Sequence, residues 1–174
     1  MKNIKTIAII GDGGWGTTIA IYLSKKGYAV NLWGAFPAYV AQVAKTRNNS
    51  KYLPGYKIPA KVLVTSNLQE AIGSAQLIIL ASPSEYLAAT LAGFKKIPYK
   101  DKYFLSVVKG IHPVSFKRMS QIIEEELGAV SLAVLSGPTI ASETAAGMVT
   151  TAVVASKNIT LAKSIQKVFH SATF

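Results

Sequence analysis

Two hydrophobic patterns alternate along the chain and predict its secondary structure. Short apolar segments predict β-strands, whereas apolar residues spaced three or four positions apart predict amphipathic helices. The expected strands cover residues 7–10, 30–33, 62–65, 77–80, 103–108, 132–135 and 151–155. The first expected helix follows residue 16 and ends at residue 27. Further helices are expected at residues 37–46, 68–72, 116–127 and 159–169, and one more is expected to begin at Pro138. This alternation predicts a single α/β domain, residues 1–174, with a doubly wound, mainly parallel Rossmann sheet and helices on both faces.

A glycine-rich turn joins the first strand to the first helix. Gly11, Gly13 and Gly16 have the G-x-G-x-x-G spacing, which suits a tight turn, close approach of a pyrophosphate to the backbone and packing of the helix on the strand. The free N–H groups at the start of that helix and its dipole favour an anion. We therefore expect a dinucleotide to bind here.

Polar loops follow several of the expected strands. Ser82 and Ser84 follow one strand, Lys109 another, and residues 136–139 a third. Parallel sheets bind ligands at the carboxyl ends of their strands, so these loops are expected to surround the ligand. A lysine here can put its ammonium group into the cleft and stabilise developing negative charge; the alternative is an ordinary surface lysine. Neither serine has a histidine at a spacing typical of hydrolases, and Ser84 is expected to cap a helix.

The cofactor could be NAD or NADP. NAD-binding domains commonly carry an Asp or Glu after the second strand, where it binds the ribose hydroxyls. Gly34, Ala35 and Phe36 occupy that place, and none of them is acidic or basic. The residues alone therefore leave the choice between the two cofactors open.

Composition narrows the function classes. The 174 residues are 50% hydrophobic, include no cysteine and have no apolar run of the roughly 18 residues that a membrane span needs. A cytoplasmic protein without a membrane span is therefore expected. The net charge of +11 comes from scattered lysines without interleaved aromatic residues, so we expect no nucleic-acid partner. His112 and His170 are isolated in the sequence, and no metal site is expected.

Several separated motifs together resemble one family. They comprise residues 11–17 with Trp15-Gly16-Thr17, residues 32–34, Arg47 with Asn49 and 52–55, residues 83–84, Lys109-Gly110, and residues 136–139 with Ala141 and Glu143. In this order and spacing they resemble the NAD(P)-dependent glycerol-3-phosphate dehydrogenases of the bacterial type. The resemblance covers essentially the whole chain.

The resemblance implies roles for individual residues. Gly14 and Trp15 would contact the cofactor beside the pyrophosphate, and Ala141 would line the nicotinamide side. The implied cofactor-binding set is Gly11, Gly13, Gly14, Trp15, Gly16, Ala35, Lys109 and Ala141. Lys109 would also touch the substrate and assist catalysis, and Gly137 and Thr139 would help to hold the substrate.

Two residues depart from the family pattern. Ala35 stands where members often carry a basic or histidine side chain, which weakens the case for NADPH. Asp12 replaces the usual small residue in the glycine turn, and its carboxylate is expected to point away from the pyrophosphate.

The resemblance also implies an activity that this chain supplies only in part. Members interconvert sn-glycerol 3-phosphate and dihydroxyacetone phosphate by hydride transfer with NAD(P)H, which feeds glycerophospholipid synthesis. Their main proton-transferring lysine lies in a helical C-terminal domain, which is absent from this chain, and the intact proteins are often homodimers. We therefore expect the chain alone to bind cofactor without turning over substrate. The alternatives are a non-catalytic dinucleotide-sensing module and a related dehydrogenase with another substrate.

Overall fold

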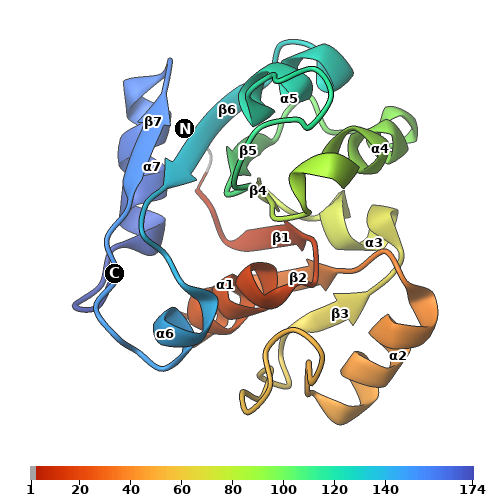
Figure 1. Cartoon of the computed structure of the whole chain (residues 1–174), viewed down its shortest axis with the longest axis vertical. Helices are drawn as coiled ribbons and strands as arrows, with labels where there is room; N and C mark the ends of the chain where they lie inside the picture. The colour runs from red at the N-terminus through yellow and green to blue at the C-terminus, as the bar shows by residue number, and fades with distance from the viewer. Residues whose placement is uncertain (1–2) are drawn as a thin grey trace.

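The computed structural model describes residues 3–174 and contains one mixed sheet. Its strands lie in the order β3-β2-β1-β4-β5-β6-β7 (Figure 1). Neighbouring strands are parallel except β6 and β7, which are antiparallel. The strands are β1 (Thr6–Ile10), β2 (Ala29–Trp33), β3 (Leu63–Thr65), β4 (Leu77–Leu80), β5 (Tyr103–Ser106), β6 (Ser131–Ser136) and β7 (Val153–Ser156).

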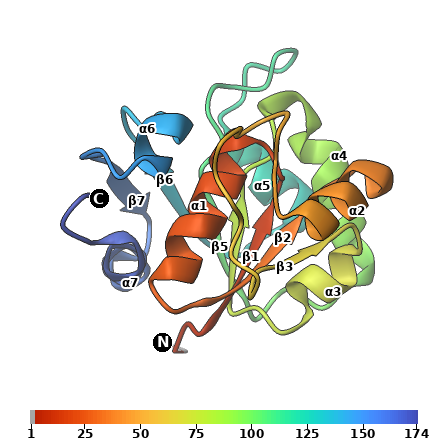
Figure 2. The same cartoon turned by 90° about the horizontal axis from the view of Figure 1, so that it is seen from below.

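Helices cover both faces of the sheet, and Figure 2 shows α1 in front of the strands and α5 behind them. The α-helices are α1 (Gly14–Lys25), α2 (Pro37–Thr46), α3 (Leu68–Gly73), α4 (Leu87–Ala92), α5 (Met119–Leu127), α6 (Ala141–Ala145) and α7 (Ile159–Phe169); the 3-10 helices are η1 (Ser84–Tyr86) and η2 (Gly93–Lys96). One hydrophobic core contains residues of α1, α2 and α7, and the other contains residues of α3, α4 and α5. The doubly wound Rossmann fold is thus confirmed.

The central strand β1 contributes residues to both cores. Ile7 and Ile9 face the first core, whereas Ala8 and Ile10 face the second, and all four residues are fully buried. Strands buried on both faces are typical of parallel sheets covered by helices.

The order of the strands reverses at β1, which places β2 on one side and β4 on the other. The N–H of Gly11 donates to the carbonyl of Trp33 at 2.9 Å, and the N–H of Ala81 donates to that of Ile10 at 2.8 Å. The turns after β1, β2 and β4 therefore meet at one edge. Such a switch point is where open α/β sheets bind ligands.

The last strand runs opposite to the others because the preceding segment does not cross back over the sheet. Instead α6 lies against α1 (Figure 1), where the hydroxyl of Thr18 donates to the carbonyl of Ala141 at 3.0 Å. The chain then re-enters the sheet from the carboxyl end of β6, so β7 pairs with β6 in the antiparallel direction.

Three local expectations were wrong. The helix expected from residue 116 begins at Met119; Phe116 is 74% exposed with φ +54°, in a loop closed by an Ile111–Arg118 bridge. The helix expected at Pro138 begins at Ala141 after an extended segment. Ser84 opens a 3-10 helix rather than capping one, since the cap position is Pro83.

None of the helices within residues 3–174 is both long and apolar enough to cross a membrane.

Candidate functional site

A cleft lies at the switch point, along the carboxyl ends of β1, β2 and β4. Its walls come from the glycine turn, the segment after β2, the loop of residues 47–55 and the segment that follows β4. The lining residues include Gly11, Asp12, Gly13, Ala35, Phe36, Lys51, Tyr52, Ala81, Ser82, Pro83 and Tyr86. We refer to this as the first cleft.

Two glycines of the motif are required by close packing. Gly11 has φ +123°, and a Cβ there would lie 2.7 Å from the backbone of Ala81 and Ser82. A Cβ at Gly16 would lie 1.9 Å from the carbonyl oxygen of Gly11. These glycines let the turn approach β4 and let α1 approach the turn.

Gly13 is different because it borders open space. A Cβ at Gly13 would have no neighbour within 4 Å among the described atoms, and Gly13 lines the first cleft. It is also the N-cap residue of α1, and it offers no side chain to the N–H groups of the first turn. Uncapped N–H groups at a helix N-terminus bind anions, so the residues here fit a pyrophosphate group.

The loop of residues 47–55 closes over the start of α1. A Cβ at Gly14 would lie 2.7 Å from the carbonyl oxygen of Tyr52 and 3.7 Å from the Cβ of Ala141. Gly14 therefore lies between this loop and α6. The structure thus places Gly14 and Ala141 side by side at the start of α1.

Asn49 fastens that loop to the glycine turn. It is fully buried, and its Nδ2 donates to the carbonyl of Asp12 at 2.7 Å and to the hydroxyl of Thr17 at 2.7 Å. Its Oδ1 accepts from the hydroxyl of Tyr39 at 2.7 Å and from the N–H of Tyr52 at 3.3 Å. One amide thus holds the turn, α2 and the loop in a fixed arrangement.

Asp12 carries a buried carboxyl group. The residue is 9% exposed, and its Oδ2 has no hydrogen-bond partner within the described part of the chain. Desolvation raises the pKa of this carboxyl above its ordinary value, while a backbone hydrogen bond and the charge of Lys51 oppose that rise. The side chain lies against Gly34, beside the end of β2.

A second cleft lies at the carboxyl ends of β5 and β6. It is lined by Ser106, Lys109, Arg118, Gly137 and Thr139, among others. The Nζ of Lys109 donates to the carbonyl of Thr139 at 2.7 Å. A Cβ at Gly137 would lie 2.5 Å from the carbonyl oxygen of Thr151, so this glycine permits the tight passage toward β7. The three residues expected to meet the substrate therefore lie together.

The residues expected at the cofactor do not all face open space. Gly11, Gly13 and Ala35 line the first cleft, whereas Gly16 is buried in the packing of α1. Trp15 is half-buried and packs against the first core.

Some residues that line the first cleft were not predicted as binding residues from the sequence. Phe36 and Tyr86 are 66% and 59% exposed and line the first cleft, as does Lys51, whose Nζ lies 4.8 Å from the centre of the Tyr52 ring. Large exposed aromatic residues beside the ends of β2 and β4 were the available sign of a binding surface.

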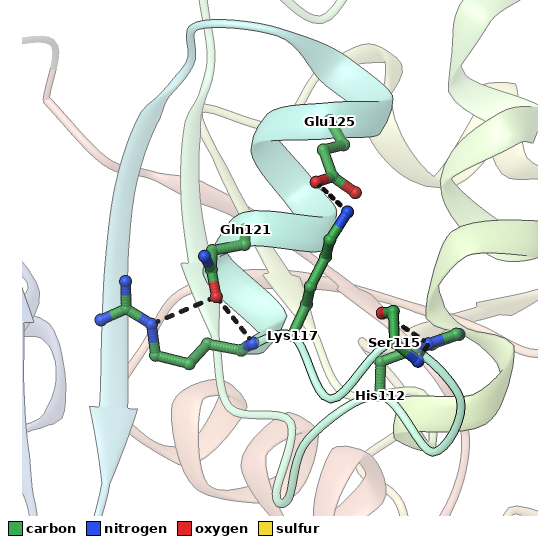
Figure 3. Close-up of polar contacts among 6 residues, drawn as sticks. His112, Ser115, Lys117, Gln121 and Glu125 are labelled. Atoms are coloured by element: carbon green, nitrogen blue, oxygen red, sulfur yellow. Dashed lines mark hydrogen bonds and ion pairs between the residues drawn. The ribbon is translucent and has the colours of Figure 1, made fainter.

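The polar contacts beyond the second cleft form local pairs. Figure 3 shows His112 beside Ser115 and Lys117 beside Glu125. The hydroxyl of Ser115 lies 2.9 Å from Nδ1 of His112, and the Nζ of Lys117 lies 2.5 Å from Oε1 of Glu125. Within residues 3–174 no group of three His, Cys, Asp or Glu side chains could hold a metal ion.

The sequence matches a known protein family over most of its length. Residues 6–162 match the family described as the N-terminus of NAD-dependent glycerol-3-phosphate dehydrogenase. A glycerol-3-phosphate dehydrogenase [NAD(P)+] from Chlorobium limicola is 38% identical over 171 residues, which are 97% of this chain and 51% of that protein. The corresponding protein of Clostridium tetani is 36% identical over 172 residues, or 99% and 49% of the two chains.

Solved structures agree with the sequence comparison. The glycerol-3-phosphate dehydrogenase of Coxiella burnetii superposes with a TM-score of 0.92 at 29% identity, covering 98% of this chain and 52% of that one. The enzyme of Plasmodium falciparum gives a TM-score of 0.87 at 26% identity, with 98% and 51% covered. The chain thus spans about half the length of the curated relatives it matches.

Proposed function

Because the chain belongs to the family of NAD-dependent glycerol-3-phosphate dehydrogenases, we propose that it is the cofactor-binding half of an oxidoreductase. The reaction would interconvert sn-glycerol 3-phosphate and dihydroxyacetone phosphate with NAD or NADP. The observation that carries this proposal is the open space over Gly13 at the start of α1, in a cleft at the switch point of the sheet.

The cofactor, when bound, supplies the hydride. Gly13 leaves room for its pyrophosphate, and the first N–H groups of α1 would bind that group. Gly14 and Ala141 lie side by side at the start of the same helix. Ala35 borders the cleft on the side of β2. The residues of the first cleft thus bind and orient the cofactor in this proposal.

The second cleft would receive the small phosphorylated substrate. Lys109 is fixed to the carbonyl of Thr139 at 2.7 Å, and its ammonium group can stabilise negative charge on the ketone oxygen. Gly137 and Thr139 line the same cleft and would help to hold the substrate. In this proposal Lys109 assists, while the main proton-transferring lysine would lie in the part of the complete protein that corresponds to the second half of the relatives.

The proposal covers the whole protein as well. In this proposal residues 1–174 are the NAD(P)-binding domain, and a helical substrate-binding domain would account for the additional length of the relatives. The complete enzyme would work as a cytoplasmic homodimer and supply glycerophospholipid synthesis. The chain of residues 1–174 alone binds cofactor and turns over no substrate.

A cofactor-oxidation assay tests this function. A protein that carries this chain and has the length of the relatives is expected to oxidise NADH or NADPH when dihydroxyacetone phosphate is added. Oxidation with a different carbonyl compound instead would point to a related dehydrogenase. Cofactor binding without turnover of any such substrate would favour a dinucleotide-sensing module. Turnover of dihydroxyacetone phosphate by residues 1–174 alone would contradict the division between the two halves.

A further inference from the structure

The end of β2 lacks the acid that commonly selects NAD. The residues that follow Trp33 are Gly34, Ala35 and Phe36, and none can bind a ribose hydroxyl through a carboxylate. A carboxylate is nevertheless present at this place, supplied by Asp12 from the neighbouring turn.

The register of the sheet brings Asp12 to this position. Ile10 pairs with Trp33, so the turn after β1 lies beside the residue after β2. A Cβ at Gly34 would lie 2.3 Å from Oδ2 of Asp12. The carboxylate thus occupies the volume that a side chain at position 34 would need, and the glycine at 34 leaves room for it.

One oxygen of the Asp12 carboxylate lacks a hydrogen-bond partner among the described residues. Asp12 is 9% exposed, and no described residue donates a hydrogen bond to its Oδ2. Lys51 is the cation whose charge acts on it, and the Lys51 side chain itself lies over the ring of Tyr52. A buried carboxylate oxygen without a donor is costly, and a hydrogen bond from a ligand hydroxyl to this carboxylate would offset that cost.

The position of Asp12 indicates which part of a ligand it meets. Asp12 lines the first cleft together with Ala35 and Phe36, on the side of β2 and apart from Lys109 in the second cleft. In dinucleotide-binding sheets the carboxylate at the end of the second strand accepts a hydrogen bond from the adenosine ribose. A phosphate on the same ribose would bring negative charge to a buried carboxylate, which is strongly unfavourable.

We propose that Asp12 is a specificity-determining residue that accepts a hydrogen bond from the ribose 2′-hydroxyl of NAD and rejects the 2′-phosphate of NADP. The inference rests on the proposed function, because it assigns a role within the same cofactor site. It makes the chain selective for NAD although β2 ends without an acid.

Binding measurements separate the contributions of hydrogen bonding and charge. NADH and NADPH are titrated separately into the chain of residues 1–174, and into Asp12→Asn and Asp12→Ala, by calorimetry. The unsubstituted chain is expected to bind NADH roughly tenfold or more tightly than NADPH. Asp12→Asn keeps a hydrogen-bonding group without charge, so NADPH binding should strengthen by roughly tenfold while NADH binding changes little. Asp12→Ala should also weaken NADH binding.

The control variant is Glu125→Gln, which removes one negative charge from an exposed pair with Lys117 on α5. It should leave both affinities unchanged, and thermal unfolding of every variant verifies that the fold is intact. Equal binding of NADH and NADPH, or an unchanged ratio in Asp12→Asn, would overturn the role of Asp12 alone. Failure of both cofactors to bind would instead contradict the proposed function, and the inference with it.

Discussion

The Nζ of Lys109 donates a hydrogen bond to the carbonyl of Thr139 at 2.7 Å, which joins the loop after β5 to the loop after β6. The side chain of Lys109 reaches across the second cleft to make this contact, although the residue itself is exposed. A long lysine side chain fixed at its end loses less freedom when it binds a substrate. The contact therefore holds the ammonium group in place at the edge where substrate is proposed to bind.

Lys109→Met tests this role. The substitution is made in a protein that carries this chain and has the full length of the relatives. It is expected to lower the turnover rate about 100-fold, because a positioned cation that stabilises transition-state charge contributes on this scale. Its unfolding free energy should change by about 0.5 kcal/mol or less, as for other exposed positions. Steady-state kinetics and urea unfolding measure the two effects. The matched control is Lys163→Met on the exposed side of α7, and equal activity of the two variants would refute the role of Lys109.

Gly13→Ala should weaken cofactor binding, whereas Gly16→Ala should lower the stability of the fold. A Cβ at Gly13 meets open space and its φ is −65°, so the fold should tolerate alanine while the methyl group intrudes where the pyrophosphate binds. A Cβ at Gly16 would lie 1.9 Å from the Gly11 oxygen, so this variant should lose about 2 kcal/mol or more of stability.

Thermal unfolding and NADH titration distinguish the two glycine variants. Gly13→Ala is expected to unfold at the temperature of the unsubstituted chain but to bind NADH at least about tenfold more weakly. If Gly13→Ala binds NADH normally, the pyrophosphate does not lie over this residue.

Asn49→Ala should destabilise the glycine turn. The substitution leaves the carbonyl of Asp12 and the hydroxyl of Tyr39 without the amide that now binds them. The Asp12 carbonyl keeps a hydrogen bond from Thr17 and the Tyr39 hydroxyl keeps one from the N–H of Lys51. Because each lost hydrogen bond costs about 0.5–1.5 kcal/mol, a loss of about 1–3 kcal/mol in urea unfolding is expected. The exposed neighbour Asn48 provides the control variant Asn48→Ala, and similar stability of both variants would show that the Asn49 bonds contribute nothing.

The regular elements near the glycine motif followed directly from the sequence. The pattern of residues 7–10 and the spacing of Gly11, Gly13 and Gly16 predicted β1, the turn and α1, because local backbone geometry there depends on nearby residues. The clustering of Lys109 with Thr139 followed from one rule, that parallel strands end at the same edge. The roles of these residues toward cofactor and substrate stay predictions.

Other features depended on packing that no local pattern encodes. Phe116 has the spacing of a core residue, yet the bridge between Ile111 and Arg118 holds it in an exposed loop. The direction of β7 depends on α6 packing against α1 instead of crossing the sheet. The proximity of Asp12 to Gly34 depends on strand register.

The pH dependence of stability should change in Asp12→Asn. Desolvation raises the pKa of Asp12 in the folded chain, so the folded state holds this proton more tightly than the unfolded state. The protonated Asp12 carboxyl therefore contributes to the free energy of unfolding. This contribution is fully present below about pH 3.9, the ordinary pKa of aspartate, and is lost as the pH rises through the folded-state pKa.

Urea unfolding across the pH range checks this sign. The stability of Asp12→Asn relative to the unsubstituted chain should be greater at pH 7 than at pH 4. A relative stability that falls over this interval would mean that the carboxylate is stabilised in the folded chain.

Calorimetric titration of the chain of residues 1–174 with NADH tests the central claim most directly. The account predicts saturable binding of one NADH per chain, with binding weakened at least about tenfold by Gly13→Ala and no turnover when dihydroxyacetone phosphate is added. The absence of saturable binding of both NADH and NADPH by the folded chain would contradict it.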